Sequence, residues 1–258
     1  MSLLKLIGLG LSSKFLTKKA IEELSSSDII YLDSYTSLSC DIDEELISSL
    51  TGNNVHVFTA NRSLLENNFK RILQYLDEGK NVAVATIGDP MIATTHISLI
   101  TEAKNRGHEF LIVPGVSVHC YMISKSMLSS YRFGKSVTIV YPFGDKIDTT
   151  PYYVLKENQE RKLHTVFYLD IRDDKPMSAI EAVSLLLKME EMEKMGVISR
   201  DDVIIVGQRL GCQDEEVVAM RLSDAVNYQF KPQPHIIVYP SKSLHFMESE
   251  GLKCLMKR

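Results

Sequence analysis

Residues 86–96, TIGDPMIATTH, bring a carboxylate, hydroxyls and an imidazole together in one short stretch. The stretch follows the apolar run 82–85 and precedes apolar residues at helical spacing, so the pattern predicts a strand, a turn and a helix. Within the turn, Gly88 tolerates backbone angles that other residues avoid, and Pro90 restricts the backbone of Asp89. The sequence therefore predicts that Asp89 lies at the carboxyl edge of a sheet, where open α/β folds bind their ligands.

The same stretch also has a purely structural interpretation. Gly-Asp-Pro is a common tight turn, and in such a turn Asp89 only faces solvent. We expect the hydroxyls of Thr94 and Thr95 to cap the following helix in either case. The flanking TTH and the residues at other strand ends favour the ligand-binding interpretation.

Several other predicted strands also end in residues suited to binding. We expect these ends to converge on one cleft between two α/β halves, a common position for a ligand pocket. The ends are Gly8–Ser12, Asp33–Ser37 (with Tyr35 and Thr36), Asp89–His96, Asp170, Gly207–Gly211 and Pro234–His235.

Strand and helix patterns alternate through the first half of the chain, which predicts βα units and a mainly parallel sheet with helices on both faces. The predicted strands are 3–7, 29–32, 55–58, 82–85 and 110–113. The predicted helices are one capped by Thr17 with Ala20, Ile21 and Leu24 on one face, one over 44–50, one with an apolar stripe from Leu65 to Leu76, and one through Ala103.

The bend at Pro114-Gly115 is the predicted boundary between an N-terminal α/β domain, 1–113, and a C-terminal α/β domain, 114–258. Strands 216–221 and 235–238 have no helix between them long enough for a parallel crossover, so the second sheet should be mixed. The other predicted elements of this half are strands 137–140, 165–169 and 203–206 and helices 116–127, 152–161 and 178–194.

Composition excludes several classes of protein. The 258 residues are 45% hydrophobic and 24% charged, as in a globular protein. A net charge of −4 gives no excess of positive charge for broad nucleic-acid binding, and the short apolar N-terminus predicts a strand rather than a membrane segment. The four cysteines form no CxxC pair, so we expect reduced thiols, no structural zinc and a cytoplasmic protein.

The usual catalytic motifs are missing. The sequence contains no GxxxxGK[ST] loop, no GxSxG elbow and no HExxH, and Ser13 stands where a dinucleotide-binding loop has its third glycine. The seven histidines are scattered, and each is more simply a structural or surface residue than a metal ligand. We therefore expect no metal site. Transfer of a group from a preactivated cofactor, which needs little acid–base machinery, suits this inventory.

Six motifs together resemble the diphthine synthases, a family of the tetrapyrrole-methylase superfamily. They are GLGLS at 8–12, YTS at 35–37, GDPMIATTH at 88–96, YRFGKSVT at 131–138, LHTVFYLDI at 163–171 and PQPHIIV at 232–238. The resemblance spans nearly the whole chain. It implies two α/β domains with a cleft for S-adenosylmethionine, which leaves as S-adenosylhomocysteine, and a homodimer. The implied substrate is translation elongation factor 2, whose histidine carries a 3-carboxy-3-aminopropyl group that the enzyme methylates on its amine.

The resemblance also implies which residues bind the cofactor. Backbone bordered by glycine can approach adenine and ribose, and apolar side chains can sandwich the base. Ordinary core packing is the alternative for the leucines and the isoleucine, and a histidine bonded to backbone is the alternative for the single histidine of this set. The implied residues are Leu11, Asp89, Ile92, Val116, Ser117, Leu169, Leu210 and His235.

No single residue stands out as a catalytic base for the amine. Asp89, Asp170 and His235 are all better suited to binding. Two other functions remain open: a methyltransferase for a tetrapyrrole or corrinoid precursor, which needs basic residues for its carboxylates, and a non-catalytic module that binds the elongation factor. We expect no direct contact with nucleic acid or membrane.

Overall fold

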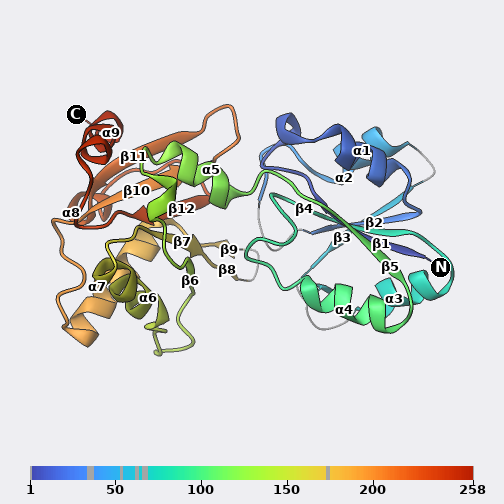
Figure 1. Ribbon diagram of the computed structural model, residues 1–258, viewed down its shortest axis with the longest axis horizontal. Coiled ribbons are helices and arrows are strands. Elements are labelled where there is room, and N and C mark those ends of the chain that lie inside the picture. The colour runs from blue at the N-terminus through green and yellow to red at the C-terminus, as the bar shows by residue number, and fades with distance from the viewer. Residues whose placement is uncertain are drawn as a thin grey trace. The chain divides into compact units, whose positions relative to one another are not determined.

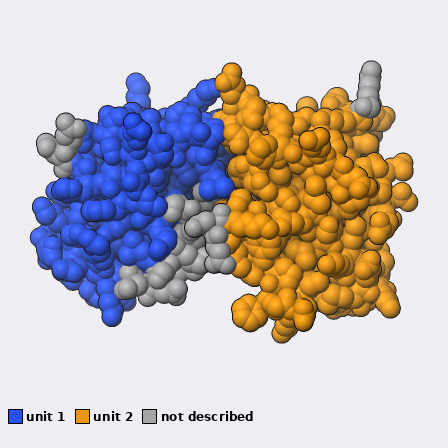
Figure 2. All heavy atoms as spheres, turned by 180° about the vertical axis from the view of Figure 1, so that it is seen from behind, with its two compact units in different colours: residues 1–118 blue, residues 119–258 orange. Residues whose placement is uncertain are grey.

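The computed structural model describes residues 2–33, 38–52, 55–61, 64–65, 69–172 and 175–257. The chain forms two compact units, Met1–Val118 (unit 1) and His119–Arg258 (unit 2), which Figure 2 colours separately. The predicted domain division after Val113 stays a prediction. Tyr35 and Thr36, expected next to Asp33, lie outside the described residues.

Unit 1 contains a parallel sheet of five strands in the order β3-β2-β4-β1-β5 (Figure 1). Successive strand residues point to opposite faces, and both faces are apolar, as expected for a sheet covered on both sides. The strands are β1 (Leu3–Gly8), β2 (Ile29–Asp33), β3 (His56–Ala60), β4 (Val82–Thr86) and β5 (Glu109–Val113).

Within the described part of unit 1, two helices pack on each face of this sheet. Helices α1 (Lys18–Ser25) and α2 (Glu44–Thr51) pack on the face that carries Ala83 and Ala85 of β4. Helices α3 (Lys70–Asp77) and α4 (Ile97–Asn105) pack on the face that carries Val82 and Val84 (Figure 1). The predicted parallel sheet with helices on both faces is confirmed.

Strands β1 and β4 are neighbours, but the chain leaves them in opposite directions. From β1 it passes through α1 to β2, beyond β4, and from β4 it passes through α4 to β5, beyond β1. Ligands of open α/β sheets bind at such a switch point, next to the carboxyl ends of the two strands. The glycine loop after β1 and the Gly-Asp-Pro turn after β4 therefore flank the expected binding position.

The N-cap predicted from the sequence is correct for α1 but not for α4. The Thr17 hydroxyl accepts a hydrogen bond from the Ala20 amide, as predicted. At α4 the N-cap is His96, whose side chain makes no capping bond. The prediction that Thr94 or Thr95 caps this helix is wrong, since the Thr94 hydroxyl donates to the Pro90 carbonyl within the preceding turn.

Unit 2 contains a mixed sheet in the order β11-β10-β12-β7-β6, which confirms the prediction. Strands β6 and β7 are parallel, whereas β10 is antiparallel to β11 and β12, and β12 is antiparallel to β7. The strands are β6 (Val137–Ile139), β7 (Thr165–Leu169), β10 (Val203–Gln208), β11 (Glu216–Arg221) and β12 (His235–Tyr239); β8 (Ile171–Arg172) and β9 (Lys175–Pro176) form a separate pair.

Helices α6 (Thr150–Glu160) and α7 (Ala179–Glu193) pack on one face of this sheet around Phe167. Helix α5 (Val118–Lys125) lies against β10. The contact is close at Gly207, where an added Cβ would be 2.8 Å from the Met122 sulfur. The remaining helices were not predicted from the sequence: α8 (Leu222–Ala225), α9 (Phe246–Leu255) and the 3-10 turns η1 (Ser13–Phe15) and η3 (Ser130–Arg132).

Cys40 and Cys212 are disulfide-bonded, so the expectation of reduced thiols is wrong for these two cysteines. Cys254 is a free cysteine. Among the helices that the structure describes, each is too short or too polar to cross a membrane.

A capping box starts α7, and its loss should be measurable. The Ser178 hydroxyl accepts from the Glu181 amide, and the Glu181 carboxylate accepts from the Ser178 amide. We expect Ser178→Ala to lower the free energy of unfolding by about 1 kcal/mol in urea titrations. Ser184→Ala is the control, because that hydroxyl only donates to the Ile180 carbonyl of the same helix, and it should change stability by less than about 0.5 kcal/mol. Equal losses would rule out the capping role.

Candidate active site

Three loops meet at the carboxyl edge of the unit 1 sheet through their glycines. Gly10 and Gly88 exchange two backbone hydrogen bonds, with N–O distances of 3.1 and 2.8 Å. A Cβ added to Gly115 would lie 2.1 Å from the Gly88 oxygen, and one added to Gly8 would lie 2.4 Å from the Gly115 nitrogen. The backbones therefore touch where no side chain fits, which fixes the loops after β1, β4 and β5 relative to one another.

Asp89 ties two of these loops together. Its Oδ1 accepts from the Met91 amide at 2.8 Å, and its Oδ2 accepts from the Gly115 amide at 3.1 Å. An ionised carboxylate has about four acceptor positions, so roughly half remain for a ligand. The half-buried Asp89 thus holds the turn in shape and still presents acceptor capacity at the sheet edge.

The other predicted residues of unit 1 lie on the same three loops. Leu11 and Ser117 are buried, Val116 is half-buried, and Ile92 is 41% exposed. A Cβ on Gly88 would be at ordinary contact distance, 3.8 Å, from the Ser117 Cα. Unit 1 therefore brings its five predicted residues to one edge, where Ile92 offers uncovered apolar surface.

The three predicted residues of unit 2 also share one sheet edge. Gln208 of β10 pairs with His235 of β12, so Leu210 follows directly at this edge. The antiparallel pair of Ile237 with Phe167 places the end of β7, Leu169, at the start of β12.

The His235 ring is held by backbone groups on both sides. Its Nδ1 accepts from the Ala179 amide at 3.0 Å, and its Nε2 donates to the Lys231 carbonyl at 2.7 Å. Burial lowers the pKa of His235, in keeping with a neutral ring. The ring anchors the start of α7, so a ligand at this position would meet the backbone or the ring carbons.

Glu215 fixes the loop after β10 against α5. Its carboxylate accepts from the Gly211 amide, the Tyr121 hydroxyl and the Lys125 ammonium, at 2.9, 2.8 and 2.6 Å. Burial opposes the charge, but these donors outweigh it and lower the pKa of Glu215. The loop that carries Leu210 is therefore attached to α5 by a charged clamp.

Unit 1 also contains a pocket of about 470 Å³, within the size range of small-molecule sites. Ser39, in its wall, donates to the Leu11 carbonyl at 3.1 Å, and Ile87, also in its wall, lies two residues before Asp89, so the pocket adjoins the predicted cofactor residues. Among the residues that the structure describes, the lining contains four carboxylates and no basic side chain. The described lining residues are Leu32, Asp33, Leu38, Ser39, Ile42, Asp43, Glu44, Glu45, Thr59 and Ile87.

A buried carboxylate–imidazole pair lies behind this pocket. The Asp33 and His96 side chains are both fully buried, and His96 Nε2 is 3.7 Å from Asp33 Oδ2. His96 Nδ1 lies 2.9 Å from the Pro90 carbonyl, in the same turn as Asp89. The sequence pattern places His96 in the turn but does not distinguish it from the six other histidines as a functional residue. The available signal was its place in the TTH of the turn, next to a strand that ends in Asp33.

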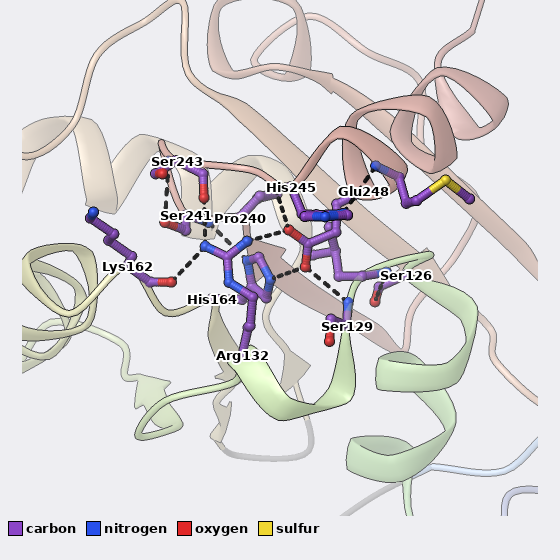
Figure 3. Close-up of polar contacts among 12 residues, drawn as sticks. Ser126, Ser129, Arg132, Lys162, His164, Pro240, Ser241, Ser243, His245 and Glu248 are labelled. Atoms are coloured by element: carbon purple, nitrogen blue, oxygen red, sulfur yellow. Dashed lines mark hydrogen bonds and ion pairs between the residues drawn. The ribbon is translucent and has the colours of Figure 1, made fainter.

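A second buried cluster, in unit 2, explains the YRFG and LHTVFYLDI motifs (Figure 3). Glu248 of α9 accepts from the amides of Ser129 and His245 and from the side chains of Arg132 and His164. The cluster joins three distant segments of the chain. It was missed because α9 itself was not predicted.

The protonation of His164 follows from its partners. Its Nδ1 accepts from the Ser241 amide at 2.9 Å, so the proton is on Nε2 and is donated to Glu248 at 3.0 Å. Burial lowers the pKa of His164 despite the nearby carboxylate. A neutral histidine with both nitrogens bonded has a structural role.

Comparison with known proteins places this chain in a family. The family model of the tetrapyrrole (corrin/porphyrin) methylases matches residues 4–226. The diphthine synthase of Sulfurisphaera tokodaii is 59% identical over 257 residues, and that of Saccharolobus solfataricus is 54% identical, each covering 100% of both chains. The chain belongs to the diphthine synthase family.

A solved structure agrees with this membership. A crystal structure of diphthine synthase superposes with a TM-score of 0.87 at 31% identity, covering 98% of this chain and 96% of the other. Diphthine synthases are S-adenosylmethionine-dependent methyltransferases of diphthamide biosynthesis, so the predicted fold, enzyme class and cofactor are confirmed.

The loops of unit 1 fit such a cofactor. The glycines bring backbone without side chains to the edge, Asp89 retains acceptor capacity, and Ile92 is 41% exposed. An acceptor carboxylate suits ribose hydroxyls or a sulfonium charge, and exposed apolar surface suits the flat face of an aromatic base.

Proposed function

We propose that this protein methylates the amine of a 3-carboxy-3-aminopropyl group on a histidine of translation elongation factor 2. The full-length identity with diphthine synthases supports the substrate, and the acidic pocket of unit 1 supports the chemical group. Carboxylates favour an ammonium ion, and the aliphatic walls suit its alkyl chain.

We propose that the cofactor-binding residues are those that the resemblance to the family implies: Leu11, Asp89, Ile92, Val116, Ser117, Leu169, Leu210 and His235. Asp89 accepts hydrogen bonds from the cofactor with the positions left by Met91 and Gly115. The leucines and Ile92 supply apolar contact, and His235 contributes backbone contact because its ring nitrogens are already used.

S-adenosylmethionine supplies an electrophilic methyl group on a sulfonium, which an amine can take directly. This chain then contributes mainly position: the glycine contacts and the Asp89 bonds hold the loops rigid, so the reacting atoms meet in one geometry. Such orientation can account for roughly 7–11 kcal/mol of a barrier in well-ordered systems.

A tetrapyrrole substrate fits the pocket less well. Its many carboxylates require basic partners, whereas the lining of this pocket contains Asp33, Asp43, Glu44 and Glu45. We therefore favour the amine of the elongation factor. Because that substrate is a translation factor, the protein acts in the cytoplasm, and we propose the homodimer implied by the resemblance to its superfamily.

Cofactor binding separates an enzyme from a non-catalytic module that binds the elongation factor. We expect S-adenosylmethionine at 100 times its Kd to raise the free energy of unfolding by about 2.7 kcal/mol, measured by denaturant titration with and without ligand. ATP serves as the control, since it shares the adenosine but not the sulfonium. Equal stabilisation by both, or by neither, would exclude the proposed cofactor site.

The substrate is tested with methyl-labelled S-adenosylmethionine. We expect label in elongation factor 2 that carries the aminocarboxypropyl histidine and none in the unmodified factor. Label in a tetrapyrrole precursor in place of the modified factor would overturn the proposed substrate.

A further inference from the structure

His119 of α5 and Tyr168 of β7 form a polar pair in unit 2, at the sheet edge where β7 ends with Leu169. We propose that His119 binds the carboxylate of an α-amino-acid group through its Nε2–H and is thereby a specificity-determining residue. Both reactants of the proposed function carry such a group: the methionine part of S-adenosylmethionine and the aminocarboxypropyl group of the modified histidine. The inference rests on the proposed function, because it assigns a partner to that carboxylate.

The tyrosine fixes the position of the His119 ring. Phe167 packs toward α6 and α7, so the next residue of the strand, Tyr168, points to the opposite face of the sheet. There its hydroxyl oxygen lies 2.7 Å from His119 Nδ1, and the two ring centroids are 5.9 Å apart. A side chain that is already held in place loses little conformational freedom when it binds a ligand.

The hydrogen bonds of the pair place the ring hydrogen of His119 on Nε2. Burial raises the pKa of Tyr168, although a hydrogen bond from the Ser136 hydroxyl opposes this rise, so the phenol keeps its proton. Because the phenol oxygen accepts from Ser136, its own O–H donates to His119 Nδ1. Burial lowers the pKa of His119, in keeping with a neutral ring. A neutral imidazole that accepts at Nδ1 is a donor at Nε2.

This donor is available to a ligand. Within the described part of the chain, His119 Nε2 makes no hydrogen bond, and the half-buried ring leaves this nitrogen accessible. A hydrogen bond to an ionised carboxylate is roughly twice as strong as one between neutral groups. His119 therefore offers a carboxylate a directed and preorganised donor.

Helix α5 carries His119 close to residues that we assign to the cofactor. Met122, one helical turn after His119, and Leu210 both approach Gly207 of β10. A Cβ added to Gly207 would lie 2.8 Å from the Met122 sulfur and 2.9 Å from Leu210 Cδ1. Ser117 lies two residues before His119. His119 is therefore a neighbour of the proposed cofactor residues along the chain and across the sheet edge.

Calorimetry tests the cofactor as the source of the carboxylate. His119→Phe keeps an aromatic ring without the donor, and His119→Gln restores an N–H. If the cofactor is the source, the wild type should bind decarboxylated S-adenosylmethionine roughly 10- to 100-fold more weakly than S-adenosylmethionine, the range for a hydrogen bond to a charged group. H119F should bind both compounds alike, and H119Q should regain part of the difference. His56→Phe, at a ring that stacks on Phe58 in unit 1, is the control and should keep the wild-type difference.

Steady-state kinetics test the substrate as the source. In that case H119F should retain the wild-type affinity for S-adenosylmethionine and for its decarboxylated form. Its KM for the modified elongation factor should instead rise roughly 10- to 100-fold, with a smaller change in kcat. H119Q should regain part of this loss, and His56→Phe should leave KM unchanged.

The tautomer of His119 is measured on the wild type. In 15N NMR at slightly alkaline pH, Nδ1 should resonate as an unprotonated ring nitrogen and Nε2 as a protonated one, and the missing signals of H119Q identify the pair. A hydrogen on Nδ1 would overturn the proposed donor. This measurement decides the point even if a variant fails to fold, which urea titrations would show.

The outcomes separate the inference from the proposed function. If H119F changes neither the preference for S-adenosylmethionine over its decarboxylated form nor the KM for the modified factor, the inference is overturned. If the wild type binds S-adenosylmethionine but transfers no methyl group to the modified factor, the proposed function fails. The calorimetry alone then decides the inference, and an unchanged preference in H119F excludes it.

Discussion

Gly115→Ala is expected to lower the free energy of unfolding by roughly 3 kcal/mol, the upper end for overpacking a rigid site. The added Cβ would lie 2.1 Å from the Gly88 oxygen and 2.8 Å from the Gly8 carbonyl carbon. All of these atoms belong to backbone, so no side-chain rotation relieves the clash. The loops after β1, β4 and β5 must separate instead.

The same substitution should weaken S-adenosylmethionine binding about 100-fold, because a displacement near 1 Å at a preorganised site has effects of this size. Asp89 would lose its bond to the Gly115 amide as the loop moves. Denaturant titration and calorimetry measure the two effects separately.

Gly196→Ala is the matched control. A Cβ at Gly196 meets open space, but its φ of +71° is left-handed, so the substitution measures backbone strain alone, about 1–2 kcal/mol. It should leave cofactor binding unchanged. A Gly115→Ala protein no less stable than Gly196→Ala, with normal cofactor affinity, would contradict the proposed role of the glycine contacts.

Glu248→Ala is expected to cost about 3–5 kcal/mol of stability, the range for removing one partner of a buried ion pair. The Glu248 side chain is 4% exposed and Arg132 is 24% exposed, so solvent screens little of the lost interaction. Two amides and the His164 ring would also lose their acceptor (Figure 3).

Glu250→Ala in the same helix is the control. Its carboxylate is exposed and pairs with Lys253 three residues away, so we expect a change below about 1 kcal/mol. Urea titrations of both variants decide the point. Similar losses would mean that the cluster contributes no more than a surface pair.

The acid dependence of the Glu248 effect has a defined sign. Burial opposes the charge, but bonds from the His245 and Ser129 amides and from His164 outweigh it and lower the pKa of Glu248 below 4.5. The unfolded chain therefore binds this proton first, so the stabilisation is complete above pH 4.5 and is lost as pH falls through the folded pKa. The stability difference between wild type and Glu248→Gln should shrink over that acid range.

Much of the fold followed from local patterns. The apolar run 82–85, the Gly-Asp-Pro turn and the spacing after His96 predicted β4, its outlet and α4, because each signal is contained within a few residues. Thr17 predicted its cap for the same reason. Capping at α4 was mispredicted because the Thr94 hydroxyl bonds to Pro90, a contact that depends on how the whole turn folds.

The sequence by itself determined the order of strands and helices, the family motifs and thereby the cofactor class. Only the tertiary structure decided which polar groups meet. The strand order places β2 beside β4 and so brings Asp33 to His96, and α9 brings Glu248 to Arg132. The tertiary structure also showed that both ring nitrogens of His235 are hydrogen-bonded to backbone, Nδ1 to the Ala179 amide and Nε2 to the Lys231 carbonyl. Such contacts join residues far apart in the chain, and no local spacing encodes which of many buried polar groups will be neighbours.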